Sequence, residues 1–554
     1  YERYRSCKNP HSTLHYNEQT YESNGEKADL FSKILAETFQ LNTTDNDKNT
    51  KKFEKEVESV VEEFKKQETD PFTELTFGEI REVINKSKKE SSMGPDKIHN
   101  QMLKRLPGQF VELIRRLFNK CIAAKRIPEI WKQARITMIP KKDDVKTDPN
   151  NYRPISVTSC LGKTFEKVMA NRLYTFLEEN KILSDAQSGF RKQRRTADNL
   201  FFLTQKVAEA FNRGKKACCL FFDISKAFDK VWHNGLVYKM VKLKIPQYLI
   251  NFVIAFLNKR KFTINVEDSE SEPRLILAGT PQGAVISPLL FSIFINDIPL
   301  KNVPNVSKSL LFADDLATMF FFKKKGNIEN QINCYNKQLD EWLKKWKMKM
   351  SVNKCRYLLF SNGYTDMSLE LKLSGEKIPI AKEMKFLGLT FDNNLNFKKQ
   401  VNEVRLKCRD RLNIIKILSN RKWCLSNKTL GNIYNSLVGS VIDYSFVCLH
   451  AIDEETLHRL QVIQNQALRS IYHLPYDCST NLLTQKAEEL SILPVAHRLD
   501  ELTTRYLQTA LDDSNKLVVD LVYEYKRGFG GRPEEFPSPL FNYLANLNIT
   551  NYQT

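Results

Sequence analysis

The stretch SKSLLFADDLATMFFF, Ser307–Phe322, places two adjacent carboxylates in the middle of a strongly apolar sequence. Apolar runs of this length predict β-strands, and the polar pair between them predicts the tight turn of a hairpin. Asp314 and Asp315 could serve only as turn formers, because Asp accepts turn geometry and hydrogen-bonds its own backbone. The usual hairpin turns carry Gly or Asn, however, and two like charges in apolar surroundings repel each other unless a cation is close by. Taken alone, the stretch leaves both interpretations open.

A second buried strand also ends in a carboxylate, about ninety residues earlier in the chain. The segment ACCLFFD, residues 217–223, is apolar on both faces, which is typical of a central strand, and Asp223 closes it. Three such carboxylates can converge only around positive charge, and hard cations such as Mg²⁺ take Asp oxygens as ligands. Two such ions about 4 Å apart hold the attacking and leaving oxygens of a phosphoryl displacement. The set predicts nucleotidyl transfer, although an Asp at a strand end often only caps the next turn, and Asp229 is interpreted in that way.

The composition favours an intracellular protein with a polyanionic partner. The 554 residues are 42% hydrophobic, and 85 Lys and Arg against 65 Asp and Glu leave a net charge of +20. Such an excess points first to nucleic acid. We find no apolar run of the roughly 18 residues that a membrane span needs, and no signal-peptide core at the N-terminus. We therefore expect no membrane partner. The eleven cysteines are scattered without zinc-site spacing, so we expect reduced thiols.

Local patterns predict an α+β protein whose body mixes strands with helices and whose C-terminal part is helical. In TLHRLQVIQNQALRSIY, residues 456–472, apolar side chains recur at helical spacing. Thr76 followed by Glu79 forms a capping box that predicts the start of another helix. In GTPQGAVISPLLF we expect Ser287 as N-cap and Pro288 as the first helical residue, after a Gly-containing loop that a ligand can approach closely.

Together, FFDISKAFD, GTPQGAVISPLLF and LFADD, in this order and spacing, resemble the motifs of reverse transcriptases. NYRPISVTSCLGKTFEKVMANRL, SGFRKQRRTADNL and GPDKI look like the finger segments and N-terminal extension of non-LTR retrotransposon enzymes. WLKKWKMKMSVNKCRYLLFS and MKFLGLTFDNNLNF match the later palm segment and the primer grip, and GNIYNSLVGSVIDYS looks like the thumb of the jockey-like group. The resemblance covers about residues 30–510. It implies a right-hand polymerase: an N-terminal extension or linker (1–70), an N-terminal extension with fingers (71–215), a palm of antiparallel sheet plus helices with primer grip (216–397), a helical thumb (398–511) and a C-terminal tail (512–554).

This resemblance implies a catalytic site built on carboxylates. Asp223, Asp314 and Asp315 match the metal-binding aspartates, and the Ile224 backbone carbonyl would be a further ligand. The implied cofactors are two Mg²⁺ ions, with Mn²⁺ as a possible substitute. Lys354 in VNKCRY matches a lysine thought to protonate the leaving pyrophosphate, although a solvated surface charge is the commoner fate of Lys.

The resemblance also implies a deoxynucleotide site. Phe228 stands where these enzymes place a ring against the sugar 2′ position, which would exclude ribonucleotides, unless it is an ordinary core aromatic. Gln282 would contact the sugar or phosphate of the incoming dNTP. Arg153 and Lys141 match the basic finger residues that hold the triphosphate, and Lys142 is an equal candidate for the role of Lys141.

An RNA template and a DNA primer are the implied macromolecular partners. Residues 397–418 predict a thumb helix with one packed face and one basic face, which would follow the backbone of an RNA/DNA hybrid. The candidate template contacts are Arg191, Arg194 and Arg195, the candidate primer contacts are Phe386 and Leu387, and the candidate thumb contacts are Lys398, Lys399, Arg405, Lys407 and Arg409.

Relatives of this kind usually carry an endonuclease before the polymerase, and residues 1–70 hold no second metal site. We therefore expect a separate or removed endonuclease domain, and synthesis primed from a nick in target DNA. The expected location is the nucleus at the site of integration, with a cytoplasmic ribonucleoprotein stage. Two alternatives remain: a catalytically inactive palm kept as an RNA-binding scaffold, which would have no need of the carboxylates, and an intron-encoded maturase, which a helical thumb disfavours.

Overall fold

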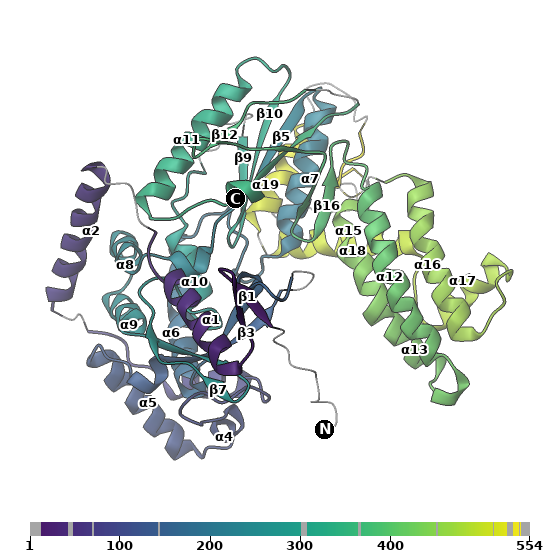
Figure 1. Ribbon diagram of the computed structural model, residues 1–554. Helices are drawn as coiled ribbons and strands as arrows, with labels where there is room; N and C mark the ends of the chain where they lie inside the picture. The colour runs from purple at the N-terminus through teal and green to yellow at the C-terminus, as the bar shows by residue number, and fades with distance from the viewer. Residues whose placement is uncertain are drawn as a thin grey trace. The chain divides into compact units, whose positions relative to one another are not determined.

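The computed structural model describes residues 13–42, 48–68, 71–141, 145–300, 307–363, 367–449, 452–513, 515–528, 536–541 and 543. The chain divides into two compact units. The first comprises Tyr1–Ser184, Ile224–Pro299 and Gln338–Met350, and the second comprises Asp185–Asp223, Leu300–Lys337 and Ser351–Thr554. Both units combine sheets with helices, which confirms the predicted α+β class (Figure 1).

The second unit is built on a five-stranded sheet with β5 (Lys216–Asp223) in its centre. The strand order is β14 (Ile380–Ala381), β11 (Arg356–Phe360), β5, β10 (Asp315–Phe322) and β9 (Ser307–Phe312). β5 runs antiparallel to both of its neighbours, and residues 217–222 are buried on both faces of the sheet. The prediction of a central strand that ends at Asp223 is confirmed.

Two helices supply side chains that cover this sheet. Leu200, Phe201 and Val207 of α7 (Thr196–Asn212) share a core with alternate β5 residues such as Cys219 and Phe221. On the opposite face, the ring of Tyr335, in α11 (Ile328–Lys345), packs against Phe222 and Phe320. Because successive β5 side chains point to opposite faces, both faces of the strand are filled.

The remaining elements of the second unit are mostly helices, as the sequence predicts. They are α12 (Lys398–Leu418), α13 (Asn427–Tyr434), α14 (Ser440–Tyr444), α15 (Phe446–Leu449), α16 (Glu454–Tyr472), α17 (Thr480–Glu489), α18 (Val495–Asp512) and α19 (Lys516–Lys526), with short hairpins β12 (Lys372–Leu373)–β13 (Glu376–Lys377) and β15 (Glu383–Phe386)–β16 (Leu389–Asp392). α12, α13, α16 and α17 gather around one apolar core (Figure 1). Leu460, Ile463, Ala467 and Ile471 of α16 are buried in it.

The first unit has its own sheet, in the order β4 (Tyr152–Val157), β3 (Gln133–Pro140), β6 (Lys261–Val266), β7 (Ser269–Glu270), with β8 (Arg274–Leu275) also paired to β6. One face of this sheet packs on α1 (Asn24–Thr38). The other elements are β1 (Leu14–Tyr16), β2 (Gln19–Tyr21), α2 (Lys48–Lys66), α3 (Phe77–Lys86), α4 (Asn100–Lys104), α5 (Gly108–Ala123), α6 (Cys160–Glu179), α8 (His233–Lys242), α9 (Gln247–Leu257) and α10 (Ser287–Phe294). Across the described parts of the chain, no helix has the length and apolar character required to cross a membrane.

The two helix starts predicted from sequence have different outcomes. The capping box of Thr76 and Glu79 is present at the start of α3. The prediction that Ser287 caps α10 is wrong, because Ser287 is the first helical residue and Ile286 precedes it. The buried carboxylate of Glu166 accepts the N–H of Val285 at 3.0 Å instead, so a side chain from α6 satisfies a donor ahead of the helix.

Candidate active site

The ends of two paired strands bring two of the predicted carboxylates face to face. Asp223 is the last residue of β5 and Asp315 is the first residue of β10, and the strand register pairs their Cα atoms. Asp314 lies in the turn immediately before β10, so the predicted hairpin is confirmed. None of the three carboxylates is fully buried, although the strands behind them are.

Burial and the charges of neighbouring acids raise the pKa values of two of these three carboxyl groups. Burial, together with the charges of Asp314 and Asp223, raises the pKa of Asp315 to about 6. Burial and the charge of Asp223 also raise the pKa of Asp314. The Nζ of Lys354 lies 3.7 Å from Asp223 Oδ2 and supplies one positive charge beside the cluster. A bound cation would relieve the remaining repulsion, since an opposite charge favours the ionised form of each acid.

The donor set fits an open magnesium site better than a closed one. Among the residues that the structure describes, no three His, Cys, Asp or Glu side chains form a ready-made metal cluster. Mg²⁺ commonly takes one or two protein carboxylates and completes its shell with water and phosphate oxygens. The hydrogen bonds beside Ile224 use the Asp223 carbonyl and the Ser225 N–H, so the Ile224 carbonyl points to the opposite edge of the backbone.

A long-range contact that the sequence analysis missed supports the turn. Ala313 has φ +58°, a left-handed conformation that is uncommon for a residue with a side chain. The buried Gln187 side chain accepts the N–H groups of both Ala313, at 3.1 Å, and Gly189, at 2.7 Å. A Cβ atom on Gly189 would lie 2.3 Å from the Ala313 nitrogen, so only glycine fits. The glycine in SGF was the available signal for this close approach.

A groove of about 270 Å³ runs beside the carboxylates. Asp223, Asp315 and Lys354 line it together with the β15–β16 hairpin. Leu387 at the hairpin tip is half-buried, and its carbonyl accepts the hydroxyl of Tyr444 at 2.7 Å. The structure therefore brings the predicted primer-grip hairpin next to the carboxylates, within one unit.

Phe386, in contrast, is an anchor of that hairpin. Its side chain is 5% exposed, and its ring centroid lies 5.3 Å from that of Phe221 in β5. The ring thus fixes the hairpin on the sheet, and Phe386 also lines the groove, so its predicted contact with the primer end stays a prediction. Leu387 remains a candidate.

The three candidate template arginines differ in their surroundings. Only 9% of the Arg194 side chain is exposed, and it contacts Asn515 and, at 3.8 Å, Asp185. The guanidinium joins this segment to the residue before α19, and the predicted template contact of Arg194 stays a prediction. Arg195 is exposed and Arg191 is half-buried, and both remain candidates.

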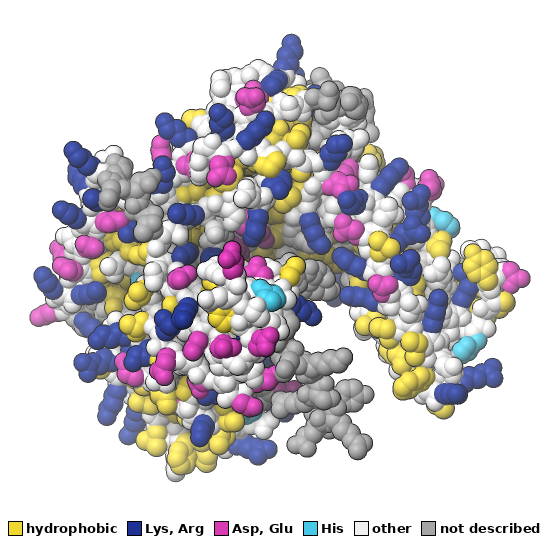
Figure 2. Space-filling model, viewed as in Figure 1, with side chains coloured by type: hydrophobic (Ala, Val, Ile, Leu, Met, Phe, Trp, Pro, Cys, Tyr) yellow, Lys and Arg dark blue, Asp and Glu magenta, His cyan; other side chains and the backbone are white. Residues whose placement is uncertain are grey.

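The five candidate basic residues of α12 are all exposed and spread around the exposed side of the helix. At 3.6 residues per turn, positions 398, 405 and 409 fall within roughly 40° of one another, whereas Lys407 lies on the far flank of the helix. Lys398 is 3.3 Å from Asp453, and Lys399 pairs with Glu383. Figure 2 shows Lys and Arg side chains over the bundle that contains α12. All five basic residues are nevertheless exposed, while the apolar side of α12 is buried, and Lys398, Arg405 and Arg409 form one stripe on the exposed side.

In the first unit, the candidate nucleotide residues are fixed by local contacts. Phe228 stacks on Phe291 with ring centroids 4.4 Å apart and stays partly exposed. Gln282 Nε2 donates to both carboxylate oxygens of Asp229, at 2.9 and 3.1 Å. Asp229 is buried, which raises its pKa to about 6. The interpretation of Asp229 as a simple turn cap misses this role in orienting Gln282.

The basic finger candidates lie on or beside β4. Arg153 is exposed on this strand, and the β4 residue Ser156 donates its N–H to the Gln282 carbonyl at 3.3 Å. Lys141 is half-buried and donates to a loop carbonyl at 3.0 Å. Lys142 lies outside the described residues.

Comparison with known proteins gives a consistent result. Residues 139–391 match the family described as reverse transcriptase (RNA-dependent DNA polymerase). The chain is 30% identical over 442 residues to the Drosophila melanogaster protein named "Probable RNA-directed DNA polymerase from transposon BS", which covers 79% of this chain and 48% of that protein. It is 29% identical to the RNA-directed DNA polymerase from mobile element jockey of the same species, with 79% and 48% coverage. The chain thus spans about half the length of these relatives.

Solved structures with some likeness include the telomerase of Candida albicans in complex with a fragment of telomeric RNA. The identity is 12%, the TM-score is 0.36, and 74% of this chain and 70% of that one are covered. The family match and the relatives agree with each other, and the paired carboxylates lie within the matched residues. Residues 139–391 belong to the reverse transcriptase family, and the chain is similar to the RNA-directed DNA polymerases of jockey-type mobile elements.

Proposed function

We propose that this chain is the polymerase part of a non-LTR retrotransposon protein and copies the RNA of the element into DNA. The observation that carries the proposal is the register of β5 and β10, which sets Asp223 against Asp315 beside the groove of the β15–β16 hairpin. A scaffold that only binds RNA would have no use for acids whose pKa values are raised by burial and by the charges of neighbouring acids.

Asp223, Asp314 and Asp315 would hold two Mg²⁺ ions, which Mn²⁺ could replace, and the Ile224 carbonyl would be a further ligand. When bound, the ions would stabilise charge on the attacking 3′-oxygen and on the leaving pyrophosphate. Lys354 lies 3.7 Å from Asp223 and would donate a proton to the pyrophosphate.

The first unit would bind the incoming dNTP. Phe228, held in place by stacking on Phe291, would close the space that a ribose 2′-hydroxyl needs. Gln282, oriented by Asp229, would contact the sugar or phosphate, and Arg153 with Lys141 would hold the triphosphate.

The nucleic-acid path would use exposed groups of the second unit. Arg191 and Arg195 would contact template phosphates, and Leu387 would contact the primer end. The stripe of Lys398, Arg405 and Arg409 on α12 would follow the hybrid backbone. Binding that rests on such contacts should weaken steeply as salt increases.

The biological setting is part of the proposal and is based on the resemblance to non-LTR retrotransposon enzymes. Synthesis would start from a nick in target DNA made by an endonuclease carried elsewhere. The location would be the nucleus at the site of integration, after a cytoplasmic ribonucleoprotein stage. The boundaries of extension, fingers, palm and thumb at residues 70, 215, 397 and 511 are proposed on the same basis.

Primer extension tests the proposal. The chain should extend oligo(dT) on poly(A) with dTTP and Mg²⁺ or Mn²⁺. Asp314→Asn should abolish extension and leave RNA binding nearly intact, whereas Asp268→Asn, the same change at an exposed position of the first unit, should leave extension unchanged. Wild-type protein that binds RNA without incorporating dTTP would support the inactive scaffold, and activity in Asp314→Asn would refute the carboxylate assignment.

A further inference from the structure

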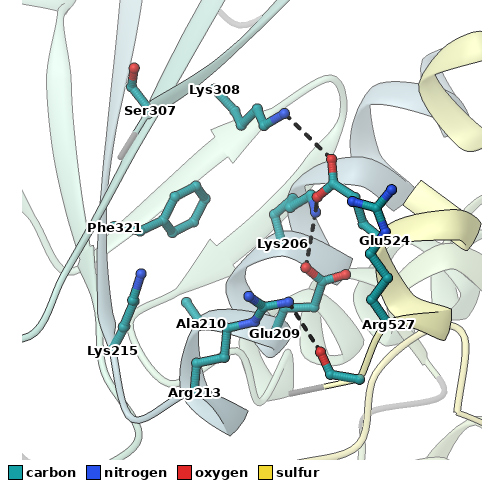
Figure 3. A pocket seen from close by; sticks show the side chains of 11 residues that line it. Lys206, Glu209, Ala210, Arg213, Lys215, Ser307, Lys308, Phe321, Glu524 and Arg527 are labelled. Atoms are coloured by element: carbon teal, nitrogen blue, oxygen red, sulfur yellow. Dashed lines mark hydrogen bonds and ion pairs between the residues drawn. The ribbon is translucent and has the colours of Figure 1, made fainter. Parts of the chain in front are cut away.

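A cavity of about 540 Å³ lies at the end of the central sheet opposite to the carboxylates (Figure 3). Its walls come from α7, α19 and the adjoining ends of β5, β9 and β10, all in the second unit. β5 runs from Lys216 at this end to Asp223 at the other, and at about 3.3 Å per residue the two ends are roughly 23 Å apart. A ligand in this cavity is therefore not the nucleotide that reacts at the carboxylates.

The acidic residues of the cavity are already neutralised. Lys206 lies 2.9 Å from Glu209 and also pairs with Glu524, and Lys308 lies 3.5 Å from Glu524. Figure 3 shows Lys308 and Lys206 turned toward Glu524. These two lysines thus neutralise both carboxylates, whereas the positive charge of the other basic residues in the cavity is not neutralised.

Three further cations line the cavity with no acidic partner within the described part of the chain: Arg213, Lys215 and Arg527. Burial and the nearby charges of Arg213 and Lys323 lower the pKa of Lys215. Like charges held together in this way are stabilised by an anion. The excess charge therefore favours an anionic ligand.

Arg213 provides a second and independent indication of an anionic ligand. One of its terminal nitrogens donates to the Gly528 carbonyl at 3.3 Å, but its Nε is buried and has no hydrogen-bond partner among the described groups. Buried donors are nearly always satisfied, and guanidinium groups match phosphate oxygens in geometry. A phosphate in the cavity would give this nitrogen its acceptor.

The residues around the cavity favour an extended polyanion over a small anion. β10 ends at Phe322, and the exposed Lys323 and Lys324 follow directly, so positive charge continues beyond the cavity. Phe321, which lines the cavity and is half-buried, offers an apolar surface to a base or sugar. We propose that this cavity is a second RNA-binding site, which holds a backbone phosphate of an RNA strand away from the carboxylates.

Charge reversal tests this site without depending on the proposed polymerase function, because RNA binding is measured in the absence of metal and dNTP. Lys215→Glu combined with Arg527→Glu should weaken binding of a long single-stranded RNA at least about tenfold at low salt. The slope of log K against log salt should become shallower by about 1.4, because each of the two cations neutralises about one phosphate of the strand in the wild-type complex and a single strand contributes about 0.7 per phosphate.

The matched control is Lys372→Glu combined with Lys377→Glu, two exposed lysines on the β12–β13 hairpin of the same unit. This pair makes the same change in net charge and should alter the affinity and the slope much less. Equal effects in both double variants would overturn the proposal, since they would show only general attraction between the protein and RNA.

Two further measurements keep the assignment testable if the reversed variant does not fold. The neutral pair Lys215→Gln and Arg527→Gln should show the same direction of change with about half the effect on affinity. Ultraviolet crosslinking of RNA to the wild-type chain should label the peptide that contains Phe321. Tight binding of ATP or pyrophosphate that the neutral pair abolishes, with RNA binding unchanged, would assign the cavity to a small phosphate ligand and overturn the RNA proposal.

Discussion

Replacing Asp229 by Asn should stabilise the protein at pH 7.5. The carboxylate is 6% exposed, and burial raises its pKa from 3.8 to about 6. One pKa unit corresponds to about 1.4 kcal/mol, so the ionised group lowers the free energy of unfolding by about 3 kcal/mol. Asn can still accept the Gln282 amide, but its own N–H donors need partners, at a cost of about 1 kcal/mol. The net gain should be about 2 kcal/mol.

The stability advantage of the Asn variant should increase as the pH rises. Below about pH 4 the Asp229 carboxyl group is protonated in both the folded and the unfolded chain. As the pH rises through the interval between 3.8 and about 6, the unfolded chain releases its proton first, so the folded wild-type protein loses stability. The Asn variant has no such titration. With the cost of about 1 kcal/mol included, its advantage should be absent near pH 4, about 0.6 kcal/mol at pH 5 and about 2 kcal/mol above pH 7.

Urea unfolding, followed by circular dichroism at pH 5 and pH 7.5, measures the difference. Asp229→Ala is the control: it also removes the charge, but it leaves Gln282 without its acceptor, so the KM for dTTP should rise in Asp229→Ala and stay near the wild-type value in Asp229→Asn. An advantage of the Asn variant that is equal at the two pH values would refute the role of the buried charge.

Three other substitutions probe the site. Gly189→Ala should reduce primer extension far more than RNA binding, because its Cβ would collide with the Ala313 nitrogen at 2.3 Å and displace the turn; full extension activity would contradict this. Phe386→Ala should lower the free energy of unfolding by about 3–5 kcal/mol through the cavity it leaves, measured in urea, with the salt dependence of RNA binding unchanged. Phe228→Ala should admit ribonucleotides in primer extension, and an unchanged ratio of dTTP to UTP incorporation would remove Phe228 from the sugar site.

The features that could be predicted from sequence are those with a local signal. The apolar run 217–222 indicated a central strand, and the polar pair at Asp314 and Asp315 indicated a hairpin; the structure confirms both. The capping box at Thr76 needs only four consecutive residues, and it is present as well.

The features that could not be predicted depend on contacts between distant positions. Because Arg194 stands in a basic run, the sequence predicts a phosphate contact for it. The sequence does not reveal that its guanidinium donates a hydrogen bond to Asn515, far along the chain. The sequence predicts Ser287 as a helix cap, but the helix already includes Ser287, and the carboxylate of Glu166, from another helix, accepts the N–H of Val285 ahead of it. Charge and capping patterns indicate what a side chain can do, whereas packing decides which partner it meets.

The contact between Gln187 and the turn at Ala313 ties the turn that carries Asp314 and Asp315 to a segment 126 positions away. Closing a loop of this length costs conformational entropy before the stabilising contacts form. The turn should therefore reach its final shape only late in folding. A fragment that begins after Phe190 would retain all three acids and both strands of the hairpin, yet lack the side chain that holds Ala313 in its left-handed conformation. Under the proposed function, the aspartates alone would therefore not make a truncated copy active, because the turn that presents two of them is held by Gln187, in a segment that contains no aspartate of the site.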